Sequence, residues 1–276
     1  KLVMTYPLWK GQIEIGEEYT NTRTTNLFSA NIPETPNADN RVDENNIAVF
    51  AELGQQFGRF MIGAGLRYEH VKFNYYEMGL LRDGQSKTYN NIFPSLNIAT
   101  EVGKVRMGLN YTGKTIRPGY DQLDGAISYI NRLTYETGNP YLKPTKLQTV
   151  EYMAQWRRFF AQLSYTYFKD GVYHITEPYG PEGEATIIRT ANLDHRHYLQ
   201  AFVGGNFQVG IWQPKVNIGM MKQWLSLPVN GEQVNMNTPI FMLQWQNAVH
   251  LPFDIWLNID AQLMTRGWDN NTRLTN

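Results

Sequence analysis

Apolar and polar residues alternate along most of the chain, and helical periodicity is nearly absent. In the clearest stretch, 60–69, one face of the pattern carries Phe60, Ile62, Ala64, Leu66 and Tyr68. Further stretches with the same alternation are 105–112, 161–167 and 253–263. A period of two is typical of a β-strand with one apolar face. The pattern therefore predicts an all-β protein.

The lengths of these stretches and of their connections favour a membrane barrel. The stretches are roughly 9–11 residues long, which is enough to cross an outer membrane at a tilt, whereas soluble strands are nearer 5–6 residues. Short turns are expected near 7–11, 55–59, 101–104, 156–159, 210–214 and 251–254. Long polar loops are expected at 21–45, 73–90, 113–146, 170–196 and 226–238. Short turns at one end and long loops at the other are typical of outer-membrane barrels.

We therefore predict an antiparallel up-and-down transmembrane β-barrel, with residues 1–276 forming a single barrel region of about twelve strands. The loop at 170–196 also carries strand patterns, at 171–176 and 185–189, around the turn residues Gly180 and Gly183. In lipid the sheet must close so that its backbone groups are paired, with one row of side chains facing lipid and the other facing a wet lumen. The residues expected to face the lumen are Arg67, Glu69, Arg106, Asn110, Glu151 and Gln155.

Composition further narrows the class of protein and its possible partners. Lys+Arg and Asp+Glu both number 25, so the zero net charge gives no electrostatic reason to expect nucleic acid as a partner. The chain has no cysteine, which excludes disulfide frameworks and thiolate metal sites. Aromatic residues make up 13%, which suits a barrel with two interfacial girdles.

One region carries a more specific motif. A Phe93-Pro94-Ser95-Leu96 strand start is followed by a loop and a turn with fixed residues. The residues of this loop and turn are Arg117, Pro118, Tyr120, Leu123, Gly138, Asn139, Pro140, Leu142 and Pro144. This order resembles the barrel of TonB-dependent outer-membrane receptors, most closely the Bacteroidetes-type outer-membrane β-barrel family.

The resemblance implies a barrel of about 22 strands, an N-terminal plug, and uptake of a nutrient ligand driven by the TonB system. We then expect a fragment from the C-terminal half of a longer chain, with the plug absent and a polar loop, 268–276, at its end. The implied location is the outer membrane of a Gram-negative bacterium. The implied partners are outer-membrane lipid, the TonB system through a plug domain outside this chain, and a surface lipoprotein.

Two other functions stay open: a non-transporting barrel with a structural, accessory or binding role, and an outer-membrane hydrolase. Ser164 and His250 lie on predicted strands without a nucleophile motif, so we expect no enzyme, catalytic residue or cofactor. Gly138 and Asn139 tolerate positive φ and are interpreted as shaping a loop at the rim, with direct substrate contact as the alternative.

Two further groups of residues have a simple and a functional interpretation. His195 and His197 are spaced as a metal could use them, but no third ligand is apparent, so a polar boundary between loop and strand is favoured and no metal is expected. Aromatic residues near strand ends suit an interfacial belt. Those that could instead stack on a ligand from the loops are Tyr75, Tyr76, Tyr129, Tyr135 and Trp268.

Overall fold

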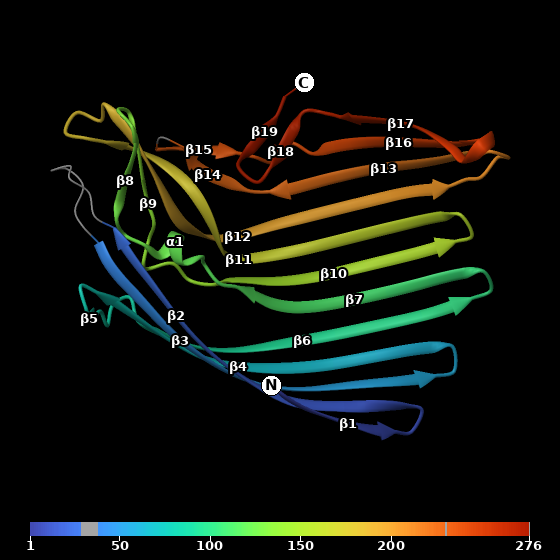
Figure 1. The fold of residues 1–276 in the computed structure, drawn as a ribbon, viewed down its shortest axis with the longest axis horizontal. Helices are drawn as coiled ribbons and strands as arrows, with labels where there is room; N and C mark the ends of the chain where they lie inside the picture. The colour runs from blue at the N-terminus through green and yellow to red at the C-terminus, as the bar shows by residue number, and fades with distance from the viewer. Residues whose placement is uncertain (29–37, 230, 276) are drawn as a thin grey trace.

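The computed structural model describes residues 1–28, 38–229 and 231–275, with side chains for all of these except Phe28, Ala38 and Tyr120. Among them, a 17-stranded sheet and a separate two-stranded sheet account for most residues (Figure 1). The helical elements described are α1 (Tyr120–Leu123) and a 3-10 turn (Pro252–Asp254). No described helix is both long and apolar enough to span a membrane.

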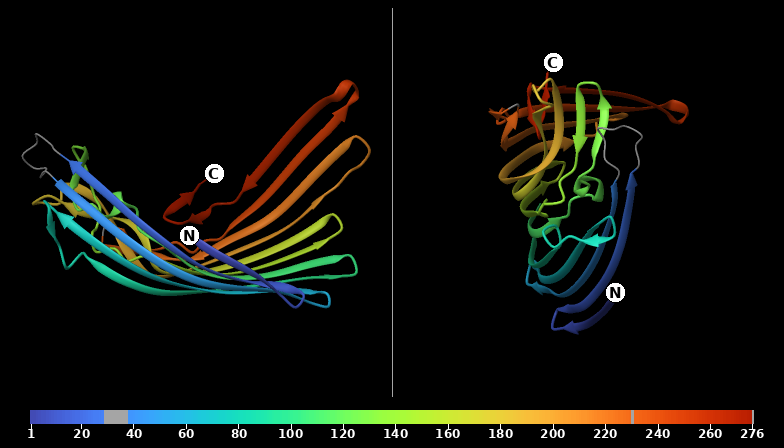
Figure 2. Two further views of the ribbon diagram at one scale, coloured as in Figure 1. Left: turned by 60° about the horizontal axis from the view of Figure 1, so that its bottom comes forward. Right: turned by 90° about the vertical axis from the view of Figure 1, so that its left-hand side faces the viewer.

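Twelve strands form the wall, and each pairs antiparallel with the next along the chain. They are β1 (Leu2–Leu8), β2 (Gly11–Phe28), β3 (Ala38–Phe57), β4 (Phe60–Glu77), β6 (Lys87–Val102), β7 (Val105–Ile116), β10 (Thr145–Trp156), β11 (Phe159–Tyr179), β12 (Ala185–Asn206), β13 (Trp212–Trp224), β16 (Ile240–Leu251) and β17 (Ile255–Met264). Figure 2 shows that they curve into a trough, with β1 and β17 along its two edges. The predicted antiparallel all-β architecture is confirmed.

Seven shorter strands lie at the end of the wall away from the short turns. They are β5 (Leu80–Leu81), β8 (Ile127–Asn131), β9 (Thr134–Thr137), β14 (Ser226–Val229), β15 (Glu232–Asn235), β18 (Gly267–Asp269) and β19 (Thr272–Leu274). Two of them extend the wall by parallel pairing, β9 beside β12 and β14 beside β11. The long connections are therefore partly folded rather than open loops.

The two faces of the wall differ as the alternation predicts. Leu66, Leu163 and Leu257 point outward and are about half exposed, at 54%, 46% and 48%. Their chain neighbours Arg67 and Gln162 point to the other face, because successive residues of a strand alternate. A continuous row of exposed large apolar side chains is stable when it contacts lipid.

The predicted loops at 21–45, 73–90 and 170–196 are wrong for most of their length, because paired strands continue through them. β4 runs on to Glu77, and the wall strands range from 7 to 22 residues rather than 9–11. Beyond the membrane the apolar residues of β4 change to the inner face, as Val71, Phe73 and Tyr75, so the alternation of 60–69 ends while the backbone ladder continues. Residues 29–37 of the first predicted loop lie outside the described part of the chain.

The strand signals inside the predicted loop 170–196 are confirmed as the distal parts of β11 and β12. The two strands stay in register as far as Tyr179 and Ala185. Gly180 and Gly183 then form the turn with φ angles of +96° and +71°, a region that glycine enters without steric cost.

We predict that Leu163→Arg, near the middle of the membrane-crossing part of β11, lowers the free energy of unfolding by about 2–4 kcal/mol, because it places a charge in lipid. The measurement is urea unfolding of the full-length protein in phosphatidylcholine vesicles, followed by tryptophan fluorescence. The matched control is Gln162→Arg on the lumen face, which should change the unfolding free energy far less. Equal losses for both variants would contradict this orientation of the wall.

Candidate functional site

The motif segment 117–144 folds back onto the lumen face of the wall. Val42, Phe73 and Tyr75 come from β3 and β4, and they form a buried cluster with Leu123 and Leu142 of the segment. The three wall residues lie on the face opposite the exposed lipid-facing row, so the cluster is inside the trough. The motif loop is thus packed against the inside of the wall.

Close backbone approach explains the glycine of the motif turn. A Cβ atom on Gly138 would lie 2.3 Å from the carbonyl oxygen of Asp124 and 2.6 Å from that of Gln122. The next residue, Asn139, donates its backbone N–H to Gln122 O at 2.6 Å and its side-chain amide to Thr190 O at 3.1 Å. The turn therefore holds α1 on one side and β12 on the other.

Three prolines complete the motif. Pro118 and Pro144 line a cavity beneath the loop. Pro140 follows Asn139 in the turn, where Asn139 Oδ1 accepts the backbone N–H of Tyr141 at 2.9 Å. The side chain of Tyr120 lies outside the described part of the structure.

An ion-pair network ties the first motif residue to the wall. The guanidinium of Arg117 donates to Glu44 at 2.8 Å and to Glu69 at 3.3 Å. Arg67 donates to the other oxygen of Glu69 at 2.7 Å and lies 3.6 Å from Glu18. Only 9% of the Glu44 side chain is exposed, so this carboxylate depends on Arg117 for compensation.

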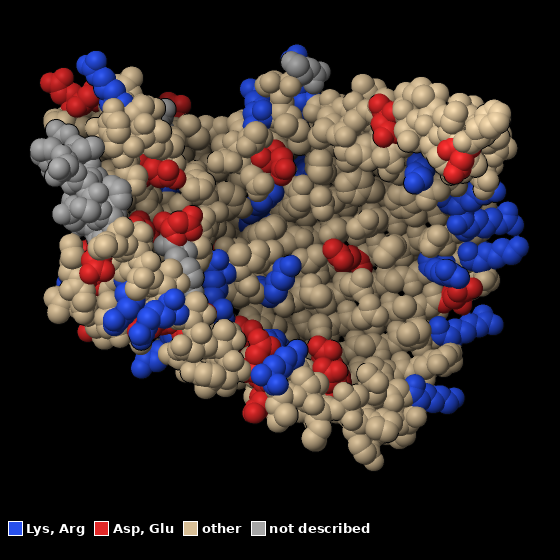
Figure 3. Space-filling model, viewed as in Figure 1, with Lys and Arg blue, Asp and Glu red and all other residues tan. Residues whose placement is uncertain are grey.

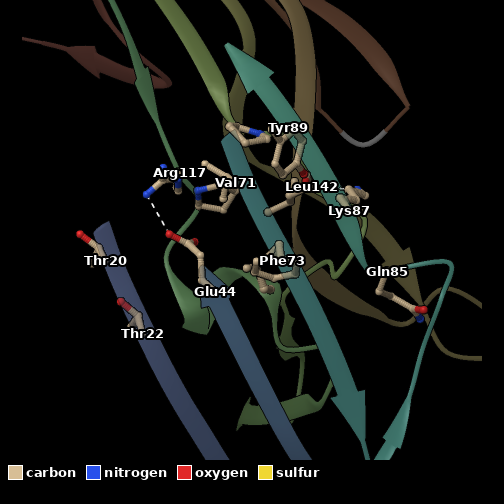
Figure 4. Close-up of a pocket in the computed structure, with 13 residues that line it drawn as sticks. Thr20, Thr22, Glu44, Val71, Phe73, Gln85, Lys87, Tyr89, Arg117 and Leu142 are labelled. Carbon is tan, nitrogen blue, oxygen red and sulfur yellow. Dashed lines mark hydrogen bonds and ion pairs between the residues drawn. The ribbon is translucent and has the colours of Figure 1, made fainter. Parts of the chain in front are cut away.

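The cavity beneath the loop has a volume of about 280 Å³. Its floor is apolar, with Val71, Phe73 and Leu142, and its edge is polar, with Thr20 and Arg117 (Figure 4). An apolar floor with a few convergent polar groups is typical of a small-molecule site. This cavity is the candidate binding site.

Burial tunes the titratable groups around this site, which lie beyond the membrane-crossing part of β4 and β6. Burial, with a smaller effect of Asp124, raises the pKa of Tyr75 to about 12. Burial likewise raises the pKa of Tyr89 to about 12. Burial and nearby Lys143 lower the pKa of Lys87, whose ammonium group donates to the carbonyl of Tyr141 at 2.8 Å.

Arg196 is a residue that sequence reasoning missed. It is only 5% exposed, and its guanidinium faces the rings of Phe168 and Tyr198 at 5.1 and 4.7 Å. It also donates to the side-chain oxygen of Asn270, whose backbone is held by buried Gln223. The arginine therefore anchors β18 and β19 to the wall. In the sequence Arg196 stands between His195 and His197, which are the residues with metal-ligand spacing, and no other feature marks it.

The remaining residues predicted to face the lumen form a group on β7 and β10. Cross-strand pairing places Gln155 opposite Arg106, and Glu151 opposite Asn110. Arg106 is exposed near the short turn and pairs with Glu101 at 3.0 Å. Asn110 accepts a hydrogen bond from Asn97, and it lines a separate cavity together with Glu151. The structure thus separates this group from the motif loop, whereas it joins Arg67 and Glu69 to Arg117.

All five candidate ligand aromatics lie in strands, so their predicted placement on loops is wrong, while contact with a ligand stays a prediction. Tyr75 is buried in the wall, and Tyr76 stacks under Arg41 at 4.0 Å on the outer face. Tyr129 in β8 meets Tyr135 in β9 edge to face at 5.7 Å. Trp268 in β18 packs against the buried cluster around Leu227. A wall strand continues past the membrane and includes Tyr75 and Tyr76, and short strands of the connections include the other three.

His195 and His197 contact each other, and His197 also contacts a tyrosine. The rings of His195 and His197 are 5.7 Å apart, and His197 Nδ1 is 2.6 Å from the hydroxyl of Tyr165. Within residues 1–28, 38–229 and 231–275, no three His, Asp or Glu side chains are grouped to hold a metal ion. Ser164 and His250 lie on β11 and β16, and His250 contacts Asp254 at 2.9 Å.

The curved antiparallel wall, its apolar outer row and its polar inner face define an outer-membrane β-barrel protein. The chain belongs to the outer membrane protein beta-barrel family, whose model matches residues 1–274. The predicted outer-membrane location is confirmed. No curated protein matches the chain.

Solved receptors and transporters share the fold. A mutant of the ferric enterobactin receptor PfeA from Pseudomonas aeruginosa, in complex with enterobactin, has a TM-score of 0.64 at 15% identity over 99% of this chain and 43% of its own. The FrpB iron transporter from Neisseria meningitidis has a TM-score of 0.59 at 12% identity, covering 96% and 42%. The copper transporter OprC has a TM-score of 0.57 at 12% identity, covering 94% and 46%. This chain therefore spans less than half the length of these structures.

We predict that Gly138→Ala loosens the motif loop at a cost of about 1–3 kcal/mol, because the new methyl group overlaps two backbone carbonyls. The measurement is hydrogen–deuterium exchange in the folded full-length protein, where the backbone amide of Asn139, which donates to Gln122 O, should exchange faster. Gly125→Ala is the matched control, because its Cβ would have only an ordinary contact with Pro140, at 3.6 Å. Unchanged exchange of the Asn139 amide in the Gly138 variant would contradict the docking.

A second prediction concerns alkaline pH. Because the folded-state pKa of Tyr75 is about 12 against an ordinary 10.0, the folded protein holds this proton more tightly. The stability from the buried phenol is fully present below pH 10 and is lost as the pH rises through 12. The difference in absorbance at 295 nm between the wild type and Tyr75→Phe should titrate near pH 12. A midpoint near pH 10 would show that the ring is not buried.

Proposed function

We propose that this chain forms part of the wall of an outer-membrane receptor that imports a nutrient ligand by TonB-dependent transport. The observation that carries the proposal is the docked motif loop. It places an amphipathic cavity of about 280 Å³ on the lumen side, beyond the membrane-crossing part of the wall. A ligand arriving from outside would meet this cavity before it reached the membrane.

The fold likeness to named receptors and transporters supports the proposal, but their ligands belong to them and are not assigned to this chain. In the proposed cycle the wall provides a fixed path, the distal strands and loops bind the ligand, and a plug in the lumen is displaced by the TonB system. We assign no covalent chemistry to any residue, and hence no enzymatic role.

The finer proposals rest on the motif and on chain length. We propose that the receptor is of the Bacteroidetes type, because residues 93–144 carry that family's order of motifs. We propose that the plug and further wall strands are encoded outside residues 1–276, because this stretch spans less than half of the similar structures. A surface lipoprotein that covers the distal end is part of the same proposal.

The test is the ion conductance of the full-length protein in planar lipid bilayers. A plugged receptor should show no steady conductance, because its lumen is filled. A version from which the segment preceding the wall is deleted should conduct steadily, which provides the positive control. The same full-length protein should be retained on an immobilised periplasmic domain of TonB from its own bacterium.

Steady conductance of the intact protein would instead favour a passive pore. A closed barrel that is not retained on TonB would favour a structural or binding role. Either result would contradict TonB-dependent transport.

A further inference from the structure

The lipid-facing side of the wall has a hollow close to the short-turn edge. It measures about 450 Å³, and apolar residues from β7, β10, β11, β12 and β13 line it. Ala154, Ala161 and Val203 lie in one row across neighbouring strands. Trp156, Phe159 and Gly205 form the next row, one step nearer the turns. The small residues leave open space between large neighbours.

Aromatic rings border the hollow where the wall meets the membrane surface. Trp156 stacks on Phe159 with ring centres 5.8 Å apart, and Phe159 meets Phe207 edge to face at 5.4 Å. Trp and other aromatic rings favour the level of lipid headgroups. This end of the hollow is therefore at headgroup depth, and the alanine row lies deeper in the hydrocarbon.

Three basic residues are chain neighbours of residues that line the hollow. Arg157 and Arg158 form the turn between Trp156 and Phe159, and Lys104 precedes Val105 of the lining. Among the described residues none of the three has a carboxylate partner, while the guanidinium of Arg157 lies 5.3 Å from the ring centre of Trp156. Figure 3 shows Lys and Arg side chains gathered along this edge of the wall.

We propose that this hollow is a discrete site for one anionic phospholipid of the periplasmic leaflet. An acyl chain lies in the hollow, and the phosphate group lies against Arg157 and Arg158. The short turns face the periplasm in barrels of this layout, which places the site in that leaflet.

Charge, rather than apolarity, gives the site its selectivity. An acyl chain is surrounded by hydrocarbon anywhere in the bilayer, so the hollow alone gains little by holding one. Arginine forms bidentate hydrogen bonds with phosphate, and two adjacent guanidinium groups favour a headgroup with net negative charge over a zwitterionic one. The hollow then accommodates the acyl chain of the same lipid, which fixes the binding position along the edge.

The rest of the short-turn edge offers the matched control. Lys10 and Arg59 are basic residues in the β1–β2 and β3–β4 turns, and no residue of those turns lines the hollow. Removing these two charges changes the net charge of the edge as much as removing Arg157 and Arg158. The comparison separates a built site from diffuse attraction.

The experiment uses delipidated full-length protein in detergent, titrated with phosphatidylglycerol or phosphatidylcholine, with bound lipid counted by native mass spectrometry. One phosphatidylglycerol should bind in preference to phosphatidylcholine. Arg157→Gln with Arg158→Gln should weaken its binding about tenfold, the effect of losing one good charged contact. The Lys10→Gln, Arg59→Gln pair should leave binding unchanged, and Arg157→Lys with Arg158→Lys should restore most of it.

The hollow itself is tested by Ala161→Phe, which fills it and should also weaken phosphatidylglycerol binding. Leu163→Phe, further along the same face and outside the lining, should not. Folding of each variant is checked by the shift in electrophoretic mobility on boiling. Equal loss in the Lys10, Arg59 pair, equal binding of both lipids, or full binding by Ala161→Phe would each overturn the proposal.

Discussion

Every backbone N–H and C=O group inside a bilayer must find its partner within the protein, and the structure depends on this requirement. It explains why consecutive strands pair antiparallel, since a tight turn returns the chain to its neighbour without leaving unpaired groups in the hydrocarbon. It also leaves the side chains to divide into two populations. Leu163 and the other side chains of the outer row can be apolar because the hydrogen bonds between strands alone satisfy the backbone.

The same ladder supports the candidate site. The distal parts of β2, β3, β4 and β6 are held in register beyond the membrane, so their inner rows present a firm surface. The motif loop uses that surface in two ways: Leu123 and Leu142 fill an apolar cluster, and Arg117 meets two carboxylates. A half-buried ion pair adds little net stability but strongly disfavours misplacement, since an unpaired Glu44 is costly. The network therefore defines where the loop sits.

The strands that could be predicted from the sequence are those in which lipid on one face and water on the other impose an alternation of apolar and polar residues. Lipid outside and water inside force the alternation seen at 60–69, so the membrane-crossing parts of the strands were predictable. Beyond the membrane the apolar row of β4 lies on the inner face, where the motif loop covers it, so residues 73–77 do not continue the pattern of 60–69 although β4 runs to Glu77. The prediction of Tyr75 and Tyr76 as loop aromatics fails for the same reason: the strand buries the Tyr75 ring and leaves the Tyr76 ring half-buried under Arg41.

The candidate site was predictable only in its local part. The spacing of Gly138 and Asn139 indicated a turn, but its partners Gln122 and Thr190 are distant in sequence. The pairing of Arg117 with Glu44 and Glu69 depends on how β3, β4 and the segment after β7 align in space, and a local sequence motif does not indicate this alignment. The burial of Arg196 could not be predicted, because the pairing of β11 and β12 brings Phe168 to it and Asn270 is distant in sequence.

The long paired extensions of β11 and β12 have a consequence for how the protein can change over evolution. In the membrane a one-residue slip would turn every leucine from lipid toward the lumen, so insertions and deletions there are eliminated. In the extension Ile187 and Thr190 are buried and also oppose a slip, but residues 180–184 at the tip are exposed, so a change of length there costs little. The tip can therefore gain, lose or shift residues while the wall beneath it stays fixed. Sequence drift should concentrate there, on the surface that other organisms and molecules encounter.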